Sequence, residues 1–350
     1  MTPLAGGRTL AIEVTRGCPR RCLYCYNHWK ASLPRDGGDA EDVGHTPAAT
    51  LGDATAEDEA RGLGFDLAVV DAALAGRSIA RVDLTGGEPL SEPGIFDVIA
   101  RVRKHGAMPA MVTDGAAIDG AAARDLRRAG VALVQPTVLS TDREVHARLK
   151  GSDTLDATIH AVALLRREGI AVSLAFICTS LNHDHLDDVV RLGRALDVAS
   201  IAFSRLCTTG AALHHRDEIW PDQWMVRAGL ARLRDLEQKH GVDVHNAVAV
   251  PHCVSETGGR CSVVAESPSY TIDAAGLVRP CAVSSVVLGS VFHSSWREID
   301  ARCLALARTF RDALPEPCRR CERLERCGGG CLASALDGGA GGRDPLADAA

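Results

Sequence analysis

The sequence predicts an α/β protein in which a partial (β/α)6 barrel is followed by a small cysteine-rich domain. Six short β-rich segments alternate with segments whose apolar residues recur at helical spacing. This repeated order favours parallel strands joined by right-handed crossovers. Ten of the thirteen cysteines fall into patterned groups near the two ends of the chain, which indicates a cysteine-rich unit after the barrel.

The barrel elements follow from this alternation. Strands are expected at Thr9–Val14, Ile79–Leu84, Pro109–Thr113, Val131–Val138, Ile170–Ile177 and Ala199–Phe203. Helices are expected at Asp66–Leu74, Ile95–Lys104, Ala121–Ala129, Leu155–Arg167 and Leu186–Leu196. A longer helix, Pro221–His240, follows the last strand, and proline suits a first helical turn.

The same pattern divides the chain into parts. Residues 1–210 form the predicted barrel, 211–245 a helical linker, 246–335 the cysteine-rich domain and 336–350 a flexible tail. Residues 32–64 lack apolar periodicity, which predicts a flexible insertion in the barrel. The composition after Cys331 is rich in Gly, Ala and Asp, which predicts a frayed end.

Charge and cysteine content exclude several classes of protein. The chain has 39 Lys and Arg against 45 Asp and Glu, a net charge of −6, with no basic cluster for nucleic acid. No leader sequence and no run of about 18 apolar residues is present, so we expect a cytoplasmic protein without a membrane partner. Thirteen cysteines in a reducing compartment are expected to bind metal. We interpret the isolated Cys178, Cys207 and Cys303 as buried apolar side chains.

The first cysteine group follows the first strand in the order Cys18-x3-Cys22-x2-Cys25. Three thiolates would then meet at the carboxyl end of the barrel strands, where barrel enzymes keep their chemistry. Three are one fewer than a fully thiolate-ligated [4Fe–4S] cluster requires, which leaves one iron open. The alternative is a zinc ion with a remote fourth ligand.

This spacing resembles the signature of the radical S-adenosylmethionine (SAM) superfamily. A second motif of that family, Gly86-Gly87-Glu88-Pro89, ends the second strand. The resemblance implies that the open iron of the [4Fe–4S] cluster chelates SAM and that the cluster reduces it to a 5′-deoxyadenosyl radical. It also implies that the backbone of the Gly-Gly-Glu-Pro motif contacts the SAM amino group.

Other SAM contacts are implied at family positions that this chain matches less closely. Tyr24 would contact the adenine, Thr113 ends the third strand, and Thr137 would reach the ribose or the carboxylate. Asp114 stands where relatives usually have Asn, and Leu139 stands where they have Asp. Asn182 and Arg205 also follow strands, and for these two a structural role and ligand contact remain equal alternatives.

The C-terminal cysteines have the spacing Cys261-x14-Gly276-x4-Cys281, then Cys318-x2-Cys321-x5-Cys327-x3-Cys331. This resembles the SPASM domain, an extension of radical SAM enzymes that holds one or two auxiliary [4Fe–4S] clusters. The resemblance implies a first auxiliary cluster on Cys253, Cys261, Cys281 and Cys331. The second would use Cys318, Cys321 and Cys327, and its usual fourth cysteine is missing. Asp337, Asp344, Asp348, water, the substrate or Cys303 could take that place.

By this resemblance the chain is an oxidoreductase that oxidises or cross-links its substrate. We expect a ribosomally made peptide, with a small metabolite such as a sugar or a tetrapyrrole as the alternative. The implied partners are an electron donor such as flavodoxin or ferredoxin and a separate peptide-recognition protein. Sulfatase maturation is not expected, because Ala282 follows Cys281 where that branch has an acid. The remote alternative is a non-catalytic zinc-binding interaction protein.

Overall fold

The computed structural model describes residues 8–28, 64–338 and 342–347. Apart from Gly64, the insertion predicted at 32–64 lies outside the described residues. In the described part, ten strands form one sheet in the order β10-β9-β8-β1-β2-β3-β4-β5-β6-β7. No helix of this part is long and apolar enough to cross a membrane.

The six predicted barrel strands are confirmed, and each is parallel to its neighbours. They are β1 (Thr9–Thr15), β2 (Arg81–Gly86), β3 (Met108–Thr113), β4 (Leu133–Pro136), β5 (Ala171–Cys178) and β6 (Ser200–Arg205). A seventh parallel strand, β7 (Asp243–Asn246), pairs with β6 and was not predicted. β7 lies at one edge of the sheet and does not pair with β1, so the barrel is open.

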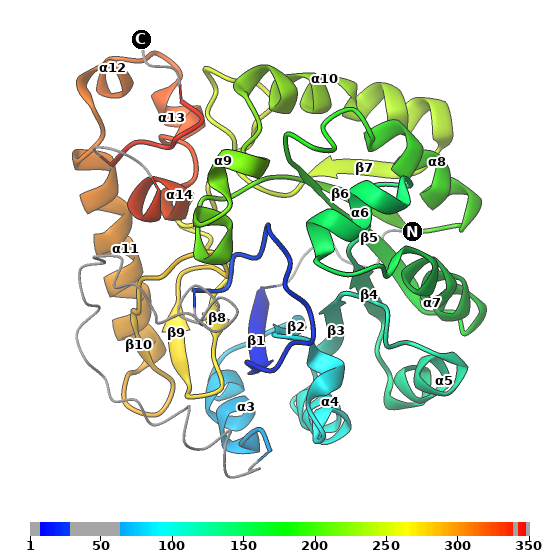
Figure 1. Cartoon of the computed structure of the whole chain (residues 1–350). Coiled ribbons are helices and arrows are strands. Elements are labelled where there is room, and N and C mark those ends of the chain that lie inside the picture. The colour runs from blue at the N-terminus through cyan, green and yellow to red at the C-terminus, as the bar shows by residue number, and fades with distance from the viewer. Residues whose placement is uncertain (1–7, 29–63, 339–341, 348–350) are drawn as a thin grey trace, which may run out of the picture.

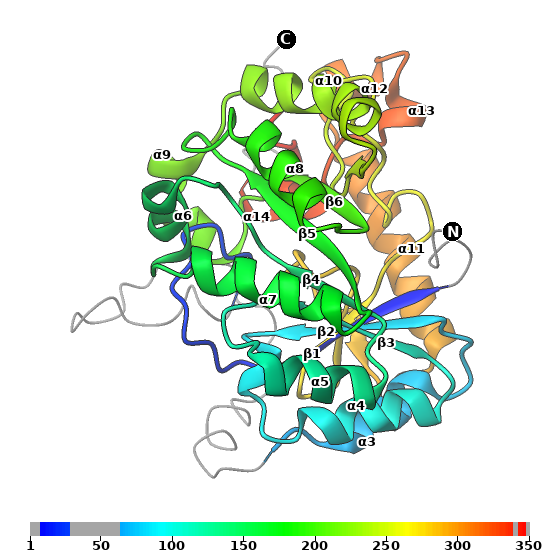
Figure 2. The ribbon, with the colours of Figure 1, turned by 90° about the vertical axis from the view of Figure 1, so that its right-hand side faces the viewer.

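The predicted helices are also confirmed, with ends that differ by one or two residues. They are α3 (Leu67–Leu74), α4 (Ile95–Lys104), α5 (Gly120–Ala129), α7 (Leu155–Arg167), α8 (Leu186–Ala195) and α10 (Gln223–His240). They lie around the outside of the strands (Figures 1 and 2). Pro221 precedes the first turn of α10 because Asp222 is the N-cap. A short helix after β4, α6 (Arg143–Lys150), was not predicted.

The buried core lies between these helices and the strands. Alternate residues of β1, Leu10, Ile12 and Val14, are at most 1% exposed and belong to the same apolar cluster as Ile99 of α4 and Leu165 of α7. Capping residues in the local sequence fix the helix ends. For example, the Asp119 side chain caps α5 by accepting from two backbone N–H groups, and Gly130 ends it at a φ of 86°.

The cysteine-rich part continues the same sheet. β8 (Thr271–Ile272) is parallel to β1, and β9 (Leu277–Arg279) and β10 (Gly289–Ser290) follow antiparallel. Four helices come next: α11 (Trp296–Asp312), α12 (Glu316–Arg319), α13 (Leu324–Cys327) and α14 (Leu332–Asp337). Figure 1 shows α11 beside β8–β10 and α14 above them. A buried ion pair between Glu13 of β1 and Arg279 of β9 crosses from one part to the other.

The prediction of a frayed tail after Cys331 is wrong for the described residues. Leu332–Asp337 form helix α14, whose first four residues are buried. Asp344 is 1% exposed and is bound to Arg205 of β6. The cause is a charge partner supplied by the barrel, which a composition argument cannot detect.

Candidate functional site

The loop after β1 carries the first three cysteines on one rim of the barrel. Cys18, Cys22 and Cys25 are each half-buried, and the Cys25 N–H donates to the Cys22 carbonyl oxygen at 3.2 Å. Arg20 lies near Cys18 and Cys22 and forms an ion pair with Asp114. Arg20 thus places a positive charge beside two of the three thiols.

The Gly86–Gly87 pair holds the start of this loop against the end of β2. The Gly87 N–H donates to Thr15 O at 2.6 Å, and the Glu88 N–H donates to Gly17 O at 2.8 Å. A Cβ on Gly87 would lie 2.6 Å from the carbonyl carbon of Gly17. The absence of a Cβ at these glycines therefore allows the backbone of β2 to approach the cysteine loop closely.

Glu88 joins the ends of two strands instead of pointing freely into the site. Its carboxylate accepts from the Thr113 hydroxyl at 2.6 Å and from the Asp114 N–H at 2.8 Å. Burial raises the pKa of Glu88, and the charge of Asp114 acts in the same direction. Pro89 begins the short 3-10 helix η1 (Pro89–Ser91), which Glu88 caps. The four-residue motif thus fixes the rim around the cysteine loop.

Sequence reasoning missed a buried cation at this rim. Lys150, the last residue of α6, is 1% exposed, and its charge interacts with Cys22, Asp114 and Glu88. Among the described residues, no carboxylate lies within ion-pair distance of its ammonium group. Burial lowers the pKa of Lys150. Lys150 is recognised as a residue of the site only from its position in space next to Cys22, because helix α6 itself was not predicted.

The remaining predicted SAM contacts lie around the same loop. Tyr24 packs into an apolar cluster with Leu139 and Leu149, and its hydroxyl is hydrogen-bonded to Cys22. Burial, followed by the charge of Cys22, raises the pKa of Tyr24 well above its usual value. Thr137 is half-buried at the end of β4, where it bridges to Ala175 of β5.

Asn182 and Arg205 have structural partners. The buried Asn182 side chain accepts from the Thr179 N–H at 2.7 Å and donates to Leu139 O at 2.8 Å, which closes the loop after β5. Arg205 binds Asp344. Of the two alternatives for these residues, the structure therefore favours the structural role.

The C-terminal cysteines form two separate groups. Cys261, Cys281 and Cys331 lie close enough for their charges to interact, and we call them the inner group. Cys318 interacts in the same way with Cys253, Cys321 and Cys327, and we call these four the outer group. Cys321 and Cys253 are exposed, whereas Cys261 and Cys331 are buried.

Three glycines separate the two groups in the chain. Gly328, Gly329 and Gly330 have φ values of 69°, 91° and 90°, a conformation that residues with a Cβ rarely adopt. They turn the chain between Cys327 and Cys331, so that these neighbouring cysteines belong to different groups.

The sulfur atoms of both groups accept backbone hydrogen bonds, as the ligands of an iron–sulfur cluster do. The Cys327 sulfur accepts from the His252 N–H at 3.3 Å. Cys261 accepts from the N–H groups of Val263, Val264 and Leu332. Among the described residues, no three His, Cys, Asp or Glu side chains converge as one metal ion would require.

Comparison with known families decides the class. Residues 12–193 match the model of the radical SAM superfamily, and residues 261–322 match that of the SPASM iron–sulfur cluster-binding domain. The chain belongs to the radical SAM superfamily. Its two matched domains are of kinds that bind iron–sulfur clusters and SAM.

The similarity to known proteins covers nearly the whole chain. The chain is 26% identical to the PqqA peptide cyclase of Gluconobacter oxydans over 97% of this chain and 89% of that protein. It is 23% identical to the PqqA peptide cyclase of Streptomyces rochei, over 96% and 88%. The fold is similar to Streptococcus suis SuiB bound to SAM, with a TM-score of 0.67 at 15% identity over 97% of this chain and 77% of that one.

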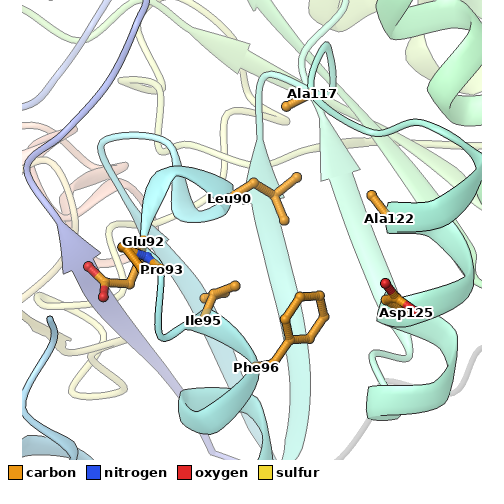
Figure 3. A pocket seen from close by; sticks show the side chains of 8 residues that line it. All are labelled: Leu90, Glu92, Pro93, Ile95, Phe96, Ala117, Ala122 and Asp125. Atoms are coloured by element: carbon orange, nitrogen blue, oxygen red, sulfur yellow. The ribbon is translucent and has the colours of Figure 1, made fainter.

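A shallow hollow in the surface lies away from the cysteines. About 340 Å³ in volume, it lies on the outer face between η1, α4 and α5. Figure 3 shows Leu90, Ile95 and Phe96 on one side and Ala122 and Asp125 on the other. Its lining combines apolar side chains with the carboxylates of Glu92 and Asp125 and contains none of the predicted site residues.

Proposed function

We propose that this chain is a radical SAM/SPASM oxidoreductase that oxidises or cross-links a ribosomally made peptide. The observation that carries the proposal is the loop after β1, where Cys18, Cys22 and Cys25 share one rim with Glu88 and Lys150. Three thiolates there leave one corner of a [4Fe–4S] cluster for SAM. When bound, the cluster and SAM supply a 5′-deoxyadenosyl radical that takes a hydrogen atom from the substrate.

The residues of the chain hold and orient these groups. Gly87 and Glu88 fix the loop by their hydrogen bonds to residues 15–17, as the distances above support. Lys150 and Arg20 place positive charge beside the thiolates, which offsets the negative charge of a thiolate-ligated cluster and of the SAM carboxylate. Tyr24 and Thr137 lie beside this loop and the end of β4, where they would contact the adenosine part of SAM.

The peptide substrate is supported by the relatives. Both relatives described above are named for a cyclase of the PqqA peptide, and neither is named for a sugar or a tetrapyrrole. SuiB, which shares the fold, has also been solved bound to its precursor peptide SuiA. A separate peptide-recognition protein is part of the proposal as the partner that would present the substrate.

The outer cysteine group suggests where an electron donor would dock. Cys321 and Cys253 are exposed, and Arg319, Arg320 and Arg326 are exposed around them. An electron carrier such as flavodoxin or ferredoxin would find a short path to the outer group there.

Anaerobic reconstitution with iron and sulfide tests the activity. With SAM and a reductant, the wild-type protein is expected to release 5′-deoxyadenosine, and the Cys18→Ala/Cys22→Ala/Cys25→Ala variant is expected to release none. Incubation with a short peptide encoded beside the gene should then give a product lighter by two hydrogen atoms per new bond, measured by mass spectrometry.

The two readouts separate the class from the substrate. A wild-type protein that leaves SAM intact would refute the whole proposal. Cleavage of SAM together with an unchanged peptide, and with conversion of a sugar or a tetrapyrrole, would refute the peptide substrate alone.

A further inference from the structure

Cys207 lies directly against the inner cysteine group, although the sequence marks it only as an isolated residue. It follows β6 by two positions and is buried in one small cluster with Cys331, Ala333 and the side of Cys281. The Cys207 thiol is hydrogen-bonded to the Cys331 sulfur. Four cysteine side chains, Cys207, Cys261, Cys281 and Cys331, therefore gather in one buried place.

Cys253 lies with the other group. It is exposed and close to Cys318, and the backbone N–H of its neighbour His252 donates to the Cys327 sulfur at 3.3 Å. Arg323 reinforces this arrangement, because it donates to His252 O at 3.1 Å and pairs with Glu256 at 2.8 Å. The segment around Cys253 is thus attached to the Cys321–Cys327 stretch.

We propose that Cys207 completes the inner group as the fourth ligand of one auxiliary cluster, and that Cys253 completes the outer group as the fourth ligand of a second. This inference rests on the proposed function, in which the C-terminal domain holds auxiliary clusters. It differs from the ligand set that the resemblance implies, in which Cys253 belongs with Cys261. It also supplies the ligand that the outer group lacks in sequence, from upstream instead of downstream.

The other predicted ligands of the outer group are occupied elsewhere. Asp344 accepts from Arg205 and from the Cys331 N–H, and Asp337 accepts from the Ser285 hydroxyl at 2.6 Å. Cys303 is buried and hydrogen-bonded to the phenol of Tyr270. Asp348 lies outside the described residues.

His252 is the one rival to Cys253 that the described residues offer. Its ring is 7% exposed, and neither ring nitrogen has a hydrogen-bond partner among the described residues. Cys253 is favoured because its charge interacts with Cys318, and because thiolate is the ligand that the other three positions of the group share.

The inference predicts which substitution removes which cluster. The parent variant lacks the first cysteine group, so that only auxiliary clusters remain: Cys18→Ala/Cys22→Ala/Cys25→Ala. An inner-only background adds Cys318→Ala/Cys321→Ala/Cys327→Ala, and an outer-only background adds Cys261→Ala/Cys281→Ala/Cys331→Ala. Each background is expected to hold about four iron atoms per chain after anaerobic reconstitution.

In the inner-only background, Cys207→Ala should lower bound iron and change the electron paramagnetic resonance spectrum of the reduced cluster, while Cys253→Ala should change neither. In the outer-only background the two substitutions should exchange roles. Cys178→Ala, at a buried cysteine of β5, is the matched control and should leave iron unchanged in both backgrounds. His252→Ala should leave the outer cluster intact.

Milder variants keep the test decisive if a background fails to fold. In the parent variant, Cys207→Ser should shift one auxiliary signal and Cys253→Ser the other, because oxygen replaces sulfur at one corner only. The inference is overturned if Cys253→Ala removes the inner cluster, if Cys207→Ser leaves both signals unchanged, or if His252→Ala removes the outer cluster. Absence of auxiliary iron in the parent variant would also overturn it. Release of 5′-deoxyadenosine by the wild-type protein would still support the proposed activity.

Discussion

The buried ion pair between Arg205 and Asp344 fixes the end of the chain against the barrel, and its removal has a calculable effect. Both side chains are 0% exposed, and the Arg205 Nη1 lies 2.8 and 2.6 Å from the two carboxylate oxygens. Asp344 also accepts from the Cys331 N–H at 2.7 Å. The Leu346 N–H donates to the same carboxylate at 2.9 Å. Asp344→Ala would therefore leave a buried guanidinium without its counter-charge and two buried amides without their acceptor.

The expected cost follows from these losses. Removing one partner of a buried pair costs about 3–5 kcal/mol, because the other charge remains uncompensated. Each unpaired buried amide adds about 1–3 kcal/mol. Since a typical domain is stable by about 5–15 kcal/mol, we expect Asp344→Ala to lose a large fraction of the free energy of unfolding.

Anaerobic urea titration followed by far-UV circular dichroism measures this cost, and a shifted midpoint at an unchanged m-value shows that the substitution changed stability. Arg205→Leu/Asp344→Leu should be more stable than Asp344→Ala, because no unpaired charge remains. Asp156→Ala, which removes an exposed ion pair to Arg143, should leave the free energy of unfolding unchanged. A loss below about 1 kcal/mol for Asp344→Ala, or a double variant that is less stable still, would refute the reasoning.

Three further predictions concern the rim and the barrel. Gly87→Ala should lower 5′-deoxyadenosine release by about tenfold or more, because its Cβ would overlap Gly17; equal rates in this variant and in Gly120→Ala would contradict this role. Lys150→Met should lower SAM cleavage but raise or preserve the stability of the iron-free protein, since a buried ammonium is costly; a loss of stability in urea would contradict this. Burial lowers the pKa of His146 to about 4. Between pH 6.5 and 4 only the unfolded chain binds a proton at His146, so the free energy of unfolding should fall by up to about 3 kcal/mol as the pH falls through that window. His146→Gln should remove this pH-dependent fall. A variant with the same pH profile as the wild type would contradict the role of His146.

The sequence predicted the barrel because its strands are nearly continuous apolar runs that lie under helices with clear periodicity. Two elements of the barrel that it missed, β7 and α6, are short and polar. The strand β7 reads Asp-Val-His-Asn and lies at the edge of the sheet, where one face need not be buried. Helix α6 spans only eight residues and buries His146, Leu149 and Lys150, a set that does not read as an apolar stripe.

Some residues of the candidate site could likewise be predicted from the sequence and others could not. The first cysteine loop and Gly86–Pro89 were predictable because each is a contiguous motif with characteristic spacing. Lys150, Asn27 and Cys207 were not, since each gains its meaning from residues far away in the chain. Asn27, for example, donates to Gly86 O at 2.6 Å and so links the cysteine loop to the end of β2. Cys207 had one available signal, its place directly after a strand on the rim where the other motifs lie.

The loop after β6 couples the two ends of the chain. Its Ala212 N–H donates to Cys25 O at 3.1 Å, and a Cβ on Gly210 would overlap the backbone of Tyr26. Four residues earlier, the Thr208 hydroxyl donates to Ser334 O at 3.4 Å in α14. The five residues 208–212 therefore contact the first cysteine loop at one end and, at the other, helix α14, which begins directly after Cys331 of the inner group. A substitution in this loop should therefore disturb both centres at once.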